Sequence, residues 1–395
     1  MARPINITTG EATARFGFRG TDLGYFTLTN HGYCLATFGD TFNNLLPGGD
    51  GWRSPVILRQ SNRNLDMGLR WDNAVGGSYA KQALPYAHAS KDNAYNVPNA
   101  PFTVIPNDVV HLPDGTYLMS AHHVRSWDRH GAASWLTWCN RFYISREQHA
   151  ENWEVANWTT PGLTGKPMQF NNDPAQEWRK FQNATFVLLD GYLYMFGTES
   201  GRTDGGGIYL SRVKWQQWHD LNAWELWGWQ GGMWRWGAAA ATPILMPTLP
   251  KGSIGEINAQ IIEGVVVLSY CDFGVGAVTR TALRTDAVWT DAQLHATQLS
   301  VPNLYAPSVH PYSTLDKPFM HLSQWKHDFY GVKFYAMDAL RRPLNLPVPE
   351  STAIGTPAPM CMDTSAMTAA ELADMLTSDT AVSAADLAKE LAKRM

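Results

Sequence analysis

The chain has 395 residues, of which 45% are hydrophobic and 17% are charged, a composition typical of a globular protein with a large core. The formal net charge is −4 and no run of Lys and Arg occurs, which excludes the basic surface that a nucleic-acid site requires. The 17 Trp, 15 Tyr and 33 Gly residues favour short strands and tight turns over helices.

The N-terminal segment, MARPINITTGEATARF, lacks the apolar stretch of a secretion signal. No run of about 18 apolar residues occurs anywhere in the chain. We therefore expect neither conventional secretion nor insertion into a membrane. The four cysteines lie far apart without a CxxC pair, and Cys34 and Cys271 sit in apolar runs, so we expect buried thiols.

Five segments share one pattern along the chain: a polar residue, a short apolar run, a turn, a second apolar run and a second polar residue. Four of the turns contain Gly between β-branched and aromatic runs, which is the sequence signal of a β-hairpin. The polar pairs are, in chain order, Asp22 and Asp40, Asp108 and His122, Asn183 and Glu199, Asn258 and Asp272, and, in a looser fifth example, Tyr305 and Trp325.

Each hairpin is followed by a further strand-like segment, such as residues 54–60, 141–146 and 330–337. Five such units at spacings of ~50–85 residues predict four-stranded blades around an axis. The expected fold is therefore all-β, a five-bladed β-propeller over residues 1–345. Six or seven shorter blades would need hairpins that the sequence does not show. The pattern leaves open whether a strand near the N-terminus completes the last blade.

Seven tryptophans lie between positions 215 and 236. Packing of an outer strand and an inter-blade loop is the favoured interpretation of this run. A platform on which sugar rings stack is the alternative, because the C–H faces of sugars pack well on indole rings.

The hairpin pattern ends before a Pro-rich linker at residues 346–366, and residues 367–395 are predicted to form a short α-helical tail. Two S/T-x-x-E/D sequences mark the starts of two helices. The second helix carries its apolar residues on one face, namely Leu387, Leu391 and Met395. Such a tail cannot bury this face alone, so we expect it to pack on the propeller or to dock on a partner protein or a sister subunit.

In an antiparallel hairpin, the residue before the first strand lies beside the residue after the second. If the hairpins are innermost, five polar pairs surround one mouth of the axis and form a concave pocket. Asp22 and Asp40 would supply two carboxylates there, which suffice to hydrolyse a glycosidic bond. One protonates the departing oxygen while the other activates water or attacks the anomeric carbon, and their mutual repulsion separates their pKa values.

Asp22 and Asp40 are thus the catalytic candidates, and the other polar residues at the mouth are candidates for binding substrate. Arg53 follows Asp40 after a loop and could orient a carboxylate or contact the sugar, or form a structural ion pair. The candidate substrate-binding residues are Arg53, Asp108, His122, Asn183, Glu199, Asn258, Asp272, Tyr305 and Trp325.

We expect no metal and no cofactor. His122 and His123 are adjacent, but neighbouring residues of a strand point to opposite faces. No third ligand follows at a diagnostic spacing.

The first blade also carries a family resemblance. Residues 21–24 (TDLG), 38–42 (FGDTF) and 51–56 (GWRSPV) occur in this order and resemble the five-bladed-propeller endo-D-arabinanases, long catalogued only as a domain of unknown function. Members of that family cleave the D-arabinan of mycobacterial arabinogalactan and lipoarabinomannan, and occur in bacteria and their phages. The resemblance implies an inverting endo-hydrolase whose catalytic pair is Asp22, taken as general base, and Asp40, taken as general acid.

Two other functions stay open. The five-bladed L-arabinanases and xylosidases use two Asp and one Glu from successive blades, and Asp22, Asp108 and Glu199 could fill those roles. A non-catalytic propeller that binds cell-wall glycan is the second alternative. We expect a place in the virion, on a phage tail acting at the host cell surface, with the helical tail contacting other tail proteins or sister subunits. Export by a non-classical route is the alternative.

Overall fold

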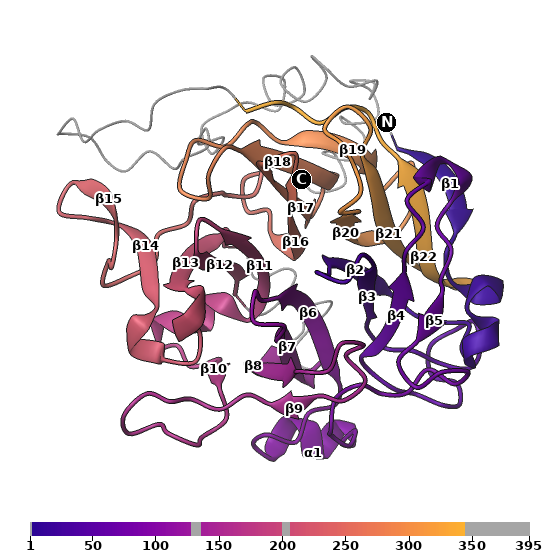
Figure 1. Ribbon diagram of the computed structural model, residues 1–395, viewed down its shortest axis with the longest axis horizontal. Coiled ribbons are helices and arrows are strands. Elements are labelled where there is room, and N and C mark those ends of the chain that lie inside the picture. Colours follow the sequence, from indigo (N-terminus) through magenta and orange to yellow (C-terminus); the bar gives the residue numbers. More distant parts are fainter. Residues whose placement is uncertain (1, 128–135, 200–205, 344–395) are drawn as a thin grey trace.

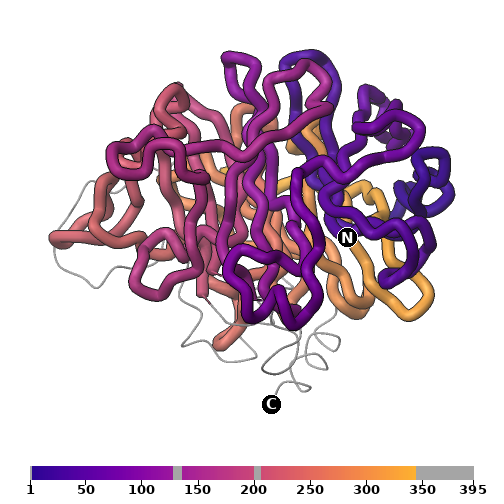
Figure 2. The backbone as a smooth tube through the Cα atoms, turned by 90° about the horizontal axis from the view of Figure 1, so that it is seen from below, coloured from indigo at the N-terminus to yellow at the C-terminus, as the bar shows by residue number. Residues whose placement is uncertain are grey.

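The computed structural model describes residues 2–127, 136–199 and 206–343, and they form a five-bladed β-propeller (Figure 1). Five antiparallel sheets surround a central axis, and their strands run roughly along it in side view (Figure 2). The all-β, five-bladed fold expected from the hairpin pattern is confirmed. The predicted linker at 346–366 and the helical tail at 367–395 lie outside the described residues.

In every blade the first strand is innermost, and the chain then moves outward. Blade 1 consists of β2 (Leu23–Leu28), β3 (Cys34–Phe38), β4 (Val56–Gln60) and β5 (Asn73–Ala74). Blade 2 consists of β6 (Val104–His111), β7 (Tyr117–Ser126), β8 (Leu136–Ser145), β9 (Glu154–Val155) and β10 (Gln169–Asn171). Blade 3 consists of β11 (Asn183–Leu189), β12 (Tyr192–Thr198), β13 (Tyr209–Lys214), β14 (Glu225–Gln230) and β15 (Met233–Trp236).

The last two blades complete the ring. Blade 4 consists of β16 (Ile254–Ile262), β17 (Val265–Asp272), β18 (Gly276–Ala282) and β19 (Gln293–Thr297). Blade 5 consists of β20 (Leu304–Val309), β21 (Phe319–Lys326), β22 (Phe329–Ala336) and, as its outermost strand, β1 (Arg3–Ile7). Because β1 pairs antiparallel with β22, from Arg3 opposite Ala336 to Ile7 opposite Lys333, the N-terminal strand closes the ring.

Over the residues that the structure describes, helices are few and short. One α-helix, α1 (Lys91–Asn96), lies between blades 1 and 2, and its N-cap Ser90 accepts a hydrogen bond from the backbone N–H of Asn93. The 3₁₀ turns are Gly10–Ala12, Ala14–Phe16, Leu65–Met67, Glu177–Phe181, Trp215–Gln217 and Leu221–Ala223. None of the helices in the described part of the chain is long and apolar enough to cross a membrane.

Apolar side chains fill the space between each pair of neighbouring blades. Between blades 1 and 2, for example, Leu35 and Ile57 pack against Val109 and Met119, and all are buried. Corresponding clusters join the other four pairs of blades. Full burial of one such side chain contributes about 1.5–3 kcal/mol. These cores give the mouth of the axis a rigid support.

The tryptophan-rich segment lies in this outer scaffold. Trp218, Trp224 and Trp227 are buried in blade 3, and Trp227 contacts Trp234 and Trp236 on the outer hairpin formed by β14 and β15. The segment therefore packs an outer strand, as the favoured interpretation of the sequence expected. The cysteines of the described residues, Cys34, Cys139 and Cys271, are buried.

The innermost strands of neighbouring blades do not pair with one another, so their backbone groups that face the axis need other hydrogen-bond partners. Polar side chains around the axis supply them. The hydroxyl of Thr27 donates to the carbonyl of Val109 (2.7 Å), and the amide of Gln260 donates to the carbonyl of Phe26 (2.7 Å). These contacts run between different blades, so this layer ties the ring together below the mouth.

Candidate active site

The mouth is the end of the axis where β2, β6, β11, β16 and β20 begin. Asp22 immediately precedes β2. Asp40 is the second residue after β3, with Gly39 between them. The hairpin pairs Leu23 with Phe38, and the N–H of Gly39 donates to the carbonyl of Asp22 (3.2 Å). Asp22 and Asp40 therefore leave adjacent strands at the same end of blade 1, as the hairpin argument required.

Asp22 is held from blade 5. Its Oδ2 accepts a hydrogen bond from the hydroxyl of Tyr305, 2.9 Å away at the start of β20. The next residue, Leu23, has a φ of 66°, which is unusual for a non-glycine residue. The hydroxyl of Ser323 accepts a hydrogen bond from the N–H of Leu23 (2.8 Å). The backbone that carries Asp22 is thus fixed in a strained conformation by blade 5, a feature common at functional sites.

The position of the Asp22 carboxylate requires a glycine at residue 39, in the FGDTF sequence. A Cβ at this position would clash with Oδ1 of Asp22. Any side chain at residue 39 would displace that carboxylate, so the glycine makes room for Asp22 immediately before Asp40.

Hydrogen bonds from a residue of its own blade and from a residue at the start of blade 2 position Asp40. Its Oδ1 accepts two hydrogen bonds, one from the indole Nε1 of Trp52 (2.8 Å) and one from the hydroxyl of Thr103 (2.6 Å). Burial raises the pKa of Asp40 to about 6, and these two hydrogen bonds oppose the rise. The carboxyl of Asp40 therefore holds its proton in mildly acidic solution, at a higher pH than an ordinary aspartic acid does.

Tyr330 connects the two aspartates. Its hydroxyl donates to the main-chain carbonyl of Asp40 (3.0 Å) and also contacts the Asp22 side chain. Burial raises the pKa of Tyr330 well above its usual value, and the nearby charges of Asp22 and Asp40 add to that rise. Tyr330 is consequently a neutral residue whose hydroxyl contacts the main-chain carbonyl of Asp40 and the side chain of Asp22.

An aromatic group lies beside Asp40. The ring of His88 stacks on Trp52 with centroids 3.8 Å apart, and the ring of Phe102 lies 5.0 Å from that of Trp52. Burial lowers the pKa of His88, so it adds an uncharged ring. This group fixes the indole whose N–H reaches Asp40 and gives the mouth an apolar wall on its blade 2 side.

Three further predicted mouth residues are engaged in contacts of their own: Glu199 and Asp272 lie at the ends of second strands, whereas His122 lies within β7, opposite Ile105 near the start of β6. His122 shares a 2.5 Å hydrogen bond with Oδ1 of Asn107. Glu199 accepts from the hydroxyl of Tyr209 (3.2 Å) and lies 3.4 Å from the guanidinium of Arg179. Asp272 is fully buried, and its Oδ2 accepts from the N–H (3.0 Å) and hydroxyl (2.6 Å) of Thr248, so it anchors the loop before blade 4.

Two predictions about the mouth are wrong. Asp108 pairs with Ser120 and Asn258 pairs with Ser269, so both lie four residues into their strands, below the mouth. The reason is that β6 and β16 begin at Val104 and Ile254, earlier than the apolar runs indicated. Bulges near these strand starts obscure the alternation from which register is inferred.

Below the mouth, these two side chains join blades. Oδ2 of Asp108 accepts from the hydroxyl of Thr185 (2.6 Å) and the N–H of Phe186 (2.9 Å) in blade 3. Burial raises the pKa of Asp108 to about 7 against the effect of these hydrogen bonds. Oδ1 of Asn258 accepts from the hydroxyl of Ser308 in blade 5 (3.0 Å). A catalytic set of Asp22, Asp108 and Glu199 is therefore not assembled at the mouth.

Asn183 and Arg53 support the scaffold. The amide of Asn183 donates to the carbonyl of Gly255 in blade 4 (3.1 Å). The guanidinium of Arg53 is buried and donates to the carbonyls of Ala80 (2.6 Å) and Gly17 (2.8 Å), while its backbone pairs with Thr41. It ties together the loops around Asp40 rather than reaching into the mouth, and we leave it out of the proposed site.

The last predicted pair, Tyr305 and Trp325, lies on the blade 5 side of the mouth. Both line a pocket between blades 4 and 5, and 58% of the Trp325 surface is exposed. Tyr305 thus contributes its hydroxyl to Asp22 and its surface to the pocket.

Sequence reasoning missed three residues that contact the two aspartates: Trp52, Thr103 and Tyr330. Trp52 had a usable signal, since it stands in the GWRSP segment next to Arg53. Thr103 and Tyr330 come from other blades, and no local pattern marks them. Within the three described stretches of the chain, no cluster of three or more His, Cys, Asp or Glu residues is arranged to hold a metal ion.

Comparisons with known proteins agree with this fold. A Bacteroides ovatus ATCC 8483 chain provisionally described as a hydrolase superposes with a TM-score of 0.53 at 13% identity, covering 82% of this chain and 87% of that one. Notoamide biosynthesis cluster protein J' of Aspergillus versicolor is 25% identical over 327 residues, covering 80% of this chain and 83% of its own length.

A further relative is the uncharacterized 35.9 kDa protein in the asd 3' region of Mycolicibacterium smegmatis. It is 24% identical over 339 residues, covering 80% of this chain and 90% of its own length. The family model described as "Domain of unknown function (DUF4185)" matches residues 8–336, which span all five blades. The chain therefore belongs to the DUF4185 family.

Proposed function

We propose that this protein is a glycoside hydrolase that cleaves internal D-arabinofuranosyl linkages of cell-wall arabinogalactan or lipoarabinomannan. One observation carries the proposal: Asp22 and Asp40 leave adjacent strands at the mouth of the propeller, in unequal environments. Two carboxyl groups with different proton affinities are what hydrolysis of a glycosidic bond requires.

Asp40 is assigned as the general acid. Both hydrogen bonds from Trp52 and Thr103 reach Oδ1, so the acidic proton resides on Oδ2. From there it passes to the glycosidic oxygen as the bond between that oxygen and the anomeric carbon breaks. A pKa of about 6 keeps Asp40 protonated in mildly acidic solution, where it can act as a general acid.

Asp22 is assigned as the general base. The hydroxyl of Tyr305 stabilises its carboxylate form by donating to Oδ2. Asp22 removes a proton from water while the water oxygen forms a new bond to the anomeric carbon on the face opposite the leaving group. Each cycle consumes one water, inverts the anomeric centre and leaves Asp22 protonated and Asp40 ionised until the protons exchange with solvent.

The choice of D-arabinan rests on the resemblance of the first blade to endo-D-arabinanases, carried by the TDLG, FGDTF and GWRSPV segments. The geometry supports these segments as one unit. Asp22, Gly39, Asp40 and Trp52 fall within them and meet at the mouth. No cofactor enters the proposed reaction.

The proposal is tested by incubating the purified protein with mycobacterial arabinogalactan and separating the products by size. Release of oligosaccharides, absent with Asp22→Asn and Asp40→Asn variants, is the expected result. Proton NMR of the first products should show inversion at the anomeric carbon. A protein that is retained on arabinogalactan without releasing products would instead be a glycan-binding propeller.

We also propose that the protein acts at a host cell surface as part of a phage tail, with residues 367–395 used for assembly. The segment carries apolar residues that a short helix cannot bury alone. A chain ending at Pro359 should then keep its hydrolytic activity but lose oligomerisation or incorporation into the particle. Loss of activity in a truncated protein that still folds would contradict this division of roles.

A further inference from the structure

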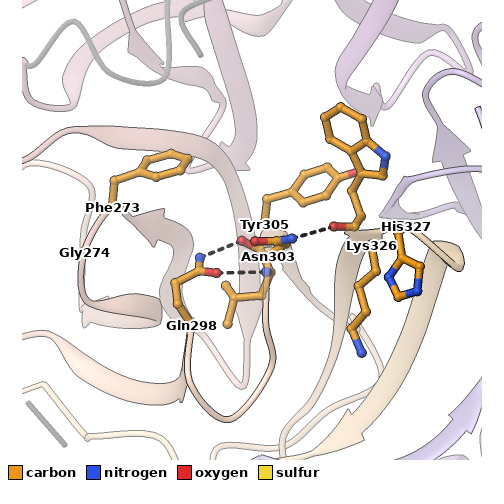
Figure 3. A pocket seen from close by; sticks show the side chains of 9 residues that line it. Phe273, Gly274, Gln298, Asn303, Tyr305, Lys326 and His327 are labelled. Carbon is orange, nitrogen blue, oxygen red and sulfur yellow. Dashed lines mark hydrogen bonds between the residues drawn. The ribbon is translucent and has the colours of Figure 1, made fainter. Parts of the chain in front are cut away.

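The pocket between blades 4 and 5 is lined in part by Tyr305, whose hydroxyl bonds Asp22, and has a volume of about 650 Å³. Its walls are the turn after β17, the segment leading into β20, and the turn between β21 and β22. Figure 3 shows Phe273 and the Lys326–His327 turn on either side of Tyr305. The volume falls within the ~300–1,000 Å³ typical of sites for small ligands.

The wall of this pocket is built to hold its shape. Gln298 forms two hydrogen bonds with the backbone of Leu304, accepting from its N–H (3.1 Å) and donating to its carbonyl (2.9 Å). The amide of Asn303 donates to the carbonyl of Trp325 (2.9 Å) (Figure 3). These contacts fix the backbone on both sides of Tyr305 before any ligand binds, which lowers the entropic cost of binding.

The side chains that face the pocket suit a sugar ring. Trp325 is 58% exposed although its backbone is anchored, so its indole is available for contact, and Phe273 offers a second aromatic ring. Aromatic faces cover the C–H surface of a sugar, while the polar groups of the rim can bond its hydroxyls. No described acidic residue forms an ion pair with Lys326, so this rim also carries a cation.

The pocket has a defined position relative to the two aspartates. Asp40 is bonded to Thr103 of blade 2, whereas Asp22 is bonded to Tyr305 of blade 5, which lines the pocket. Across the mouth, the order is therefore blade 2, Asp40, Asp22, Tyr305, pocket. The leaving group lies toward the acid, so the other part of the chain, the glycone, lies toward the base and the pocket.

We propose that this pocket binds one sugar residue of the substrate chain on the glycone side of the bond that is cleaved, with Trp325 as its stacking surface. The inference rests on the proposed function and on the roles given to Asp22 and Asp40. It makes Trp325 a binding residue that sets where along the chain the enzyme cuts.

The binding part is tested without hydrolysis. In a protein carrying Asp22→Asn and Asp40→Asn, retardation by arabinogalactan in affinity electrophoresis gives a dissociation constant. Adding Trp325→Ala should weaken binding about tenfold, equivalent to about 1.4 kcal/mol, whereas Trp325→Phe should restore most of it. Trp229→Ala, on the outer strand β14, is the matched control and should leave binding unchanged. Equal binding by the Trp325→Ala protein and its parent would overturn the subsite.

The direction is tested with a linear arabino-oligosaccharide labelled at its reducing end. Without the glycone subsite, cleavage should move toward the non-reducing end, so Trp325→Ala should release longer labelled products than the otherwise wild-type enzyme. Shorter or unchanged labelled products would overturn the glycone assignment. If the wild-type protein releases nothing but Trp325→Ala still weakens binding, the proposed hydrolysis fails while the sugar-binding role of the pocket stands.

Discussion

The hydroxyl of Thr103, one residue before blade 2 begins, donates a 2.6 Å hydrogen bond to Oδ1 of Asp40 at the end of the first hairpin of blade 1. The bond fixes which oxygen of Asp40 is free to carry a proton, because the indole of Trp52 reaches the same Oδ1. Thr103 before blade 2 and Trp52 in the loop between β3 and β4 of blade 1 thus orient the carboxyl of Asp40 together.

The pH dependence of activity should show the protonation of Asp40. Burial raises its pKa to about 6, so the acid loses its proton above that pH. We expect kcat/KM to fall on the alkaline side with a midpoint near pH 6. Hydrolysis rates measured from pH 4 to 9 at constant ionic strength check this. A rate that stays level to pH 9 would remove Asp40 as the acid.

Removing a hydrogen bond to Asp40 should shift the alkaline limb of the pH profile, the side on which kcat/KM falls. Thr103→Val and Trp52→Phe each delete a donor that stabilises the ionised carboxylate, and both donors lower the pKa of Asp40. Its pKa should therefore rise, and the alkaline limb should shift to higher pH by about 0.5–1 unit, in line with a hydrogen bond to a charged group partly offset by solvent. Thr159→Val, whose hydroxyl bonds the remote His219, is the matched control. A lower maximal rate with an unmoved limb would mean that these residues only support the fold.

Asp40→Asn should lose activity by about 10²–10⁴-fold, the usual contribution of a general acid. It should also change stability in a pH-dependent way. Because the pKa of about 6 in the folded protein exceeds the 3.8 that is usual for an aspartic acid, the native protein binds more protons than the unfolded chain between about pH 4 and 6. Wild-type stability therefore falls as pH rises through that window, and the neutral Asn escapes this cost.

Thermal unfolding of the two proteins at pH 4 and pH 8 measures that difference. We expect the stability of the Asp40→Asn protein relative to wild type to increase by about 3 kcal/mol from pH 4 to pH 8, the free energy that corresponds to the raised pKa of Asp40. A variant that is less stable at every pH would show that the carboxylate contributes to folding instead.

Tyr305→Phe separates the two roles of this tyrosine. The ring remains in the pocket wall, but the hydrogen bond to Oδ2 of Asp22 is lost. A hydrogen bond to a charged group contributes about 1.5–3 kcal/mol, so kcat should fall at least tenfold while KM changes little. Steady-state kinetics on a defined oligosaccharide provide both constants. Tyr312→Phe, which loses a bond to the carbonyl of Gly32 far from Asp22, should behave like wild type. An effect on KM alone would mean that the hydroxyl of Tyr305 binds substrate and does not support Asp22 as the base.

Asp108→Ala tests the three-carboxylate alternative. Asp108 accepts from Val109 N–H (2.8 Å), Phe186 N–H and the hydroxyl of Thr185, so its loss strands buried donors. Each stranded group costs about 1–3 kcal/mol of unfolding free energy, which urea unfolding can measure. The folded variant should still hydrolyse substrate at a rate near that of wild type. If Asp108→Ala fails to fold, the milder Asp108→Asn serves. A variant of normal stability and no activity would restore Asp108 as catalytic.

The hairpins and the pair of carboxylates at Asp22 and Asp40 could be predicted from local patterns in the chain. Glycine turns between apolar runs define each hairpin locally, and a hairpin brings its two ends together whatever surrounds it. This is why Asp22 and Asp40 could be placed side by side although 17 residues lie between them. The same local reasoning failed at Asp108 and Asn258. Their strands begin earlier than the apolar run indicates, and a bulge near each start interrupts the alternation of buried and exposed residues.

The residues that surround those carboxylates come from several blades and could not be predicted from local patterns. Thr103, Tyr305 and Tyr330 reach the site from blades 2 and 5, and the closing strand β1 is paired with β22 more than 300 positions away. Such contacts depend on how blades pack around the axis, and a short-range pattern of apolar and polar residues contains no information about that packing. The pKa of Asp40 and the pocket beside Tyr305 follow from burial between blades, so they are properties of the closed ring rather than of any one segment.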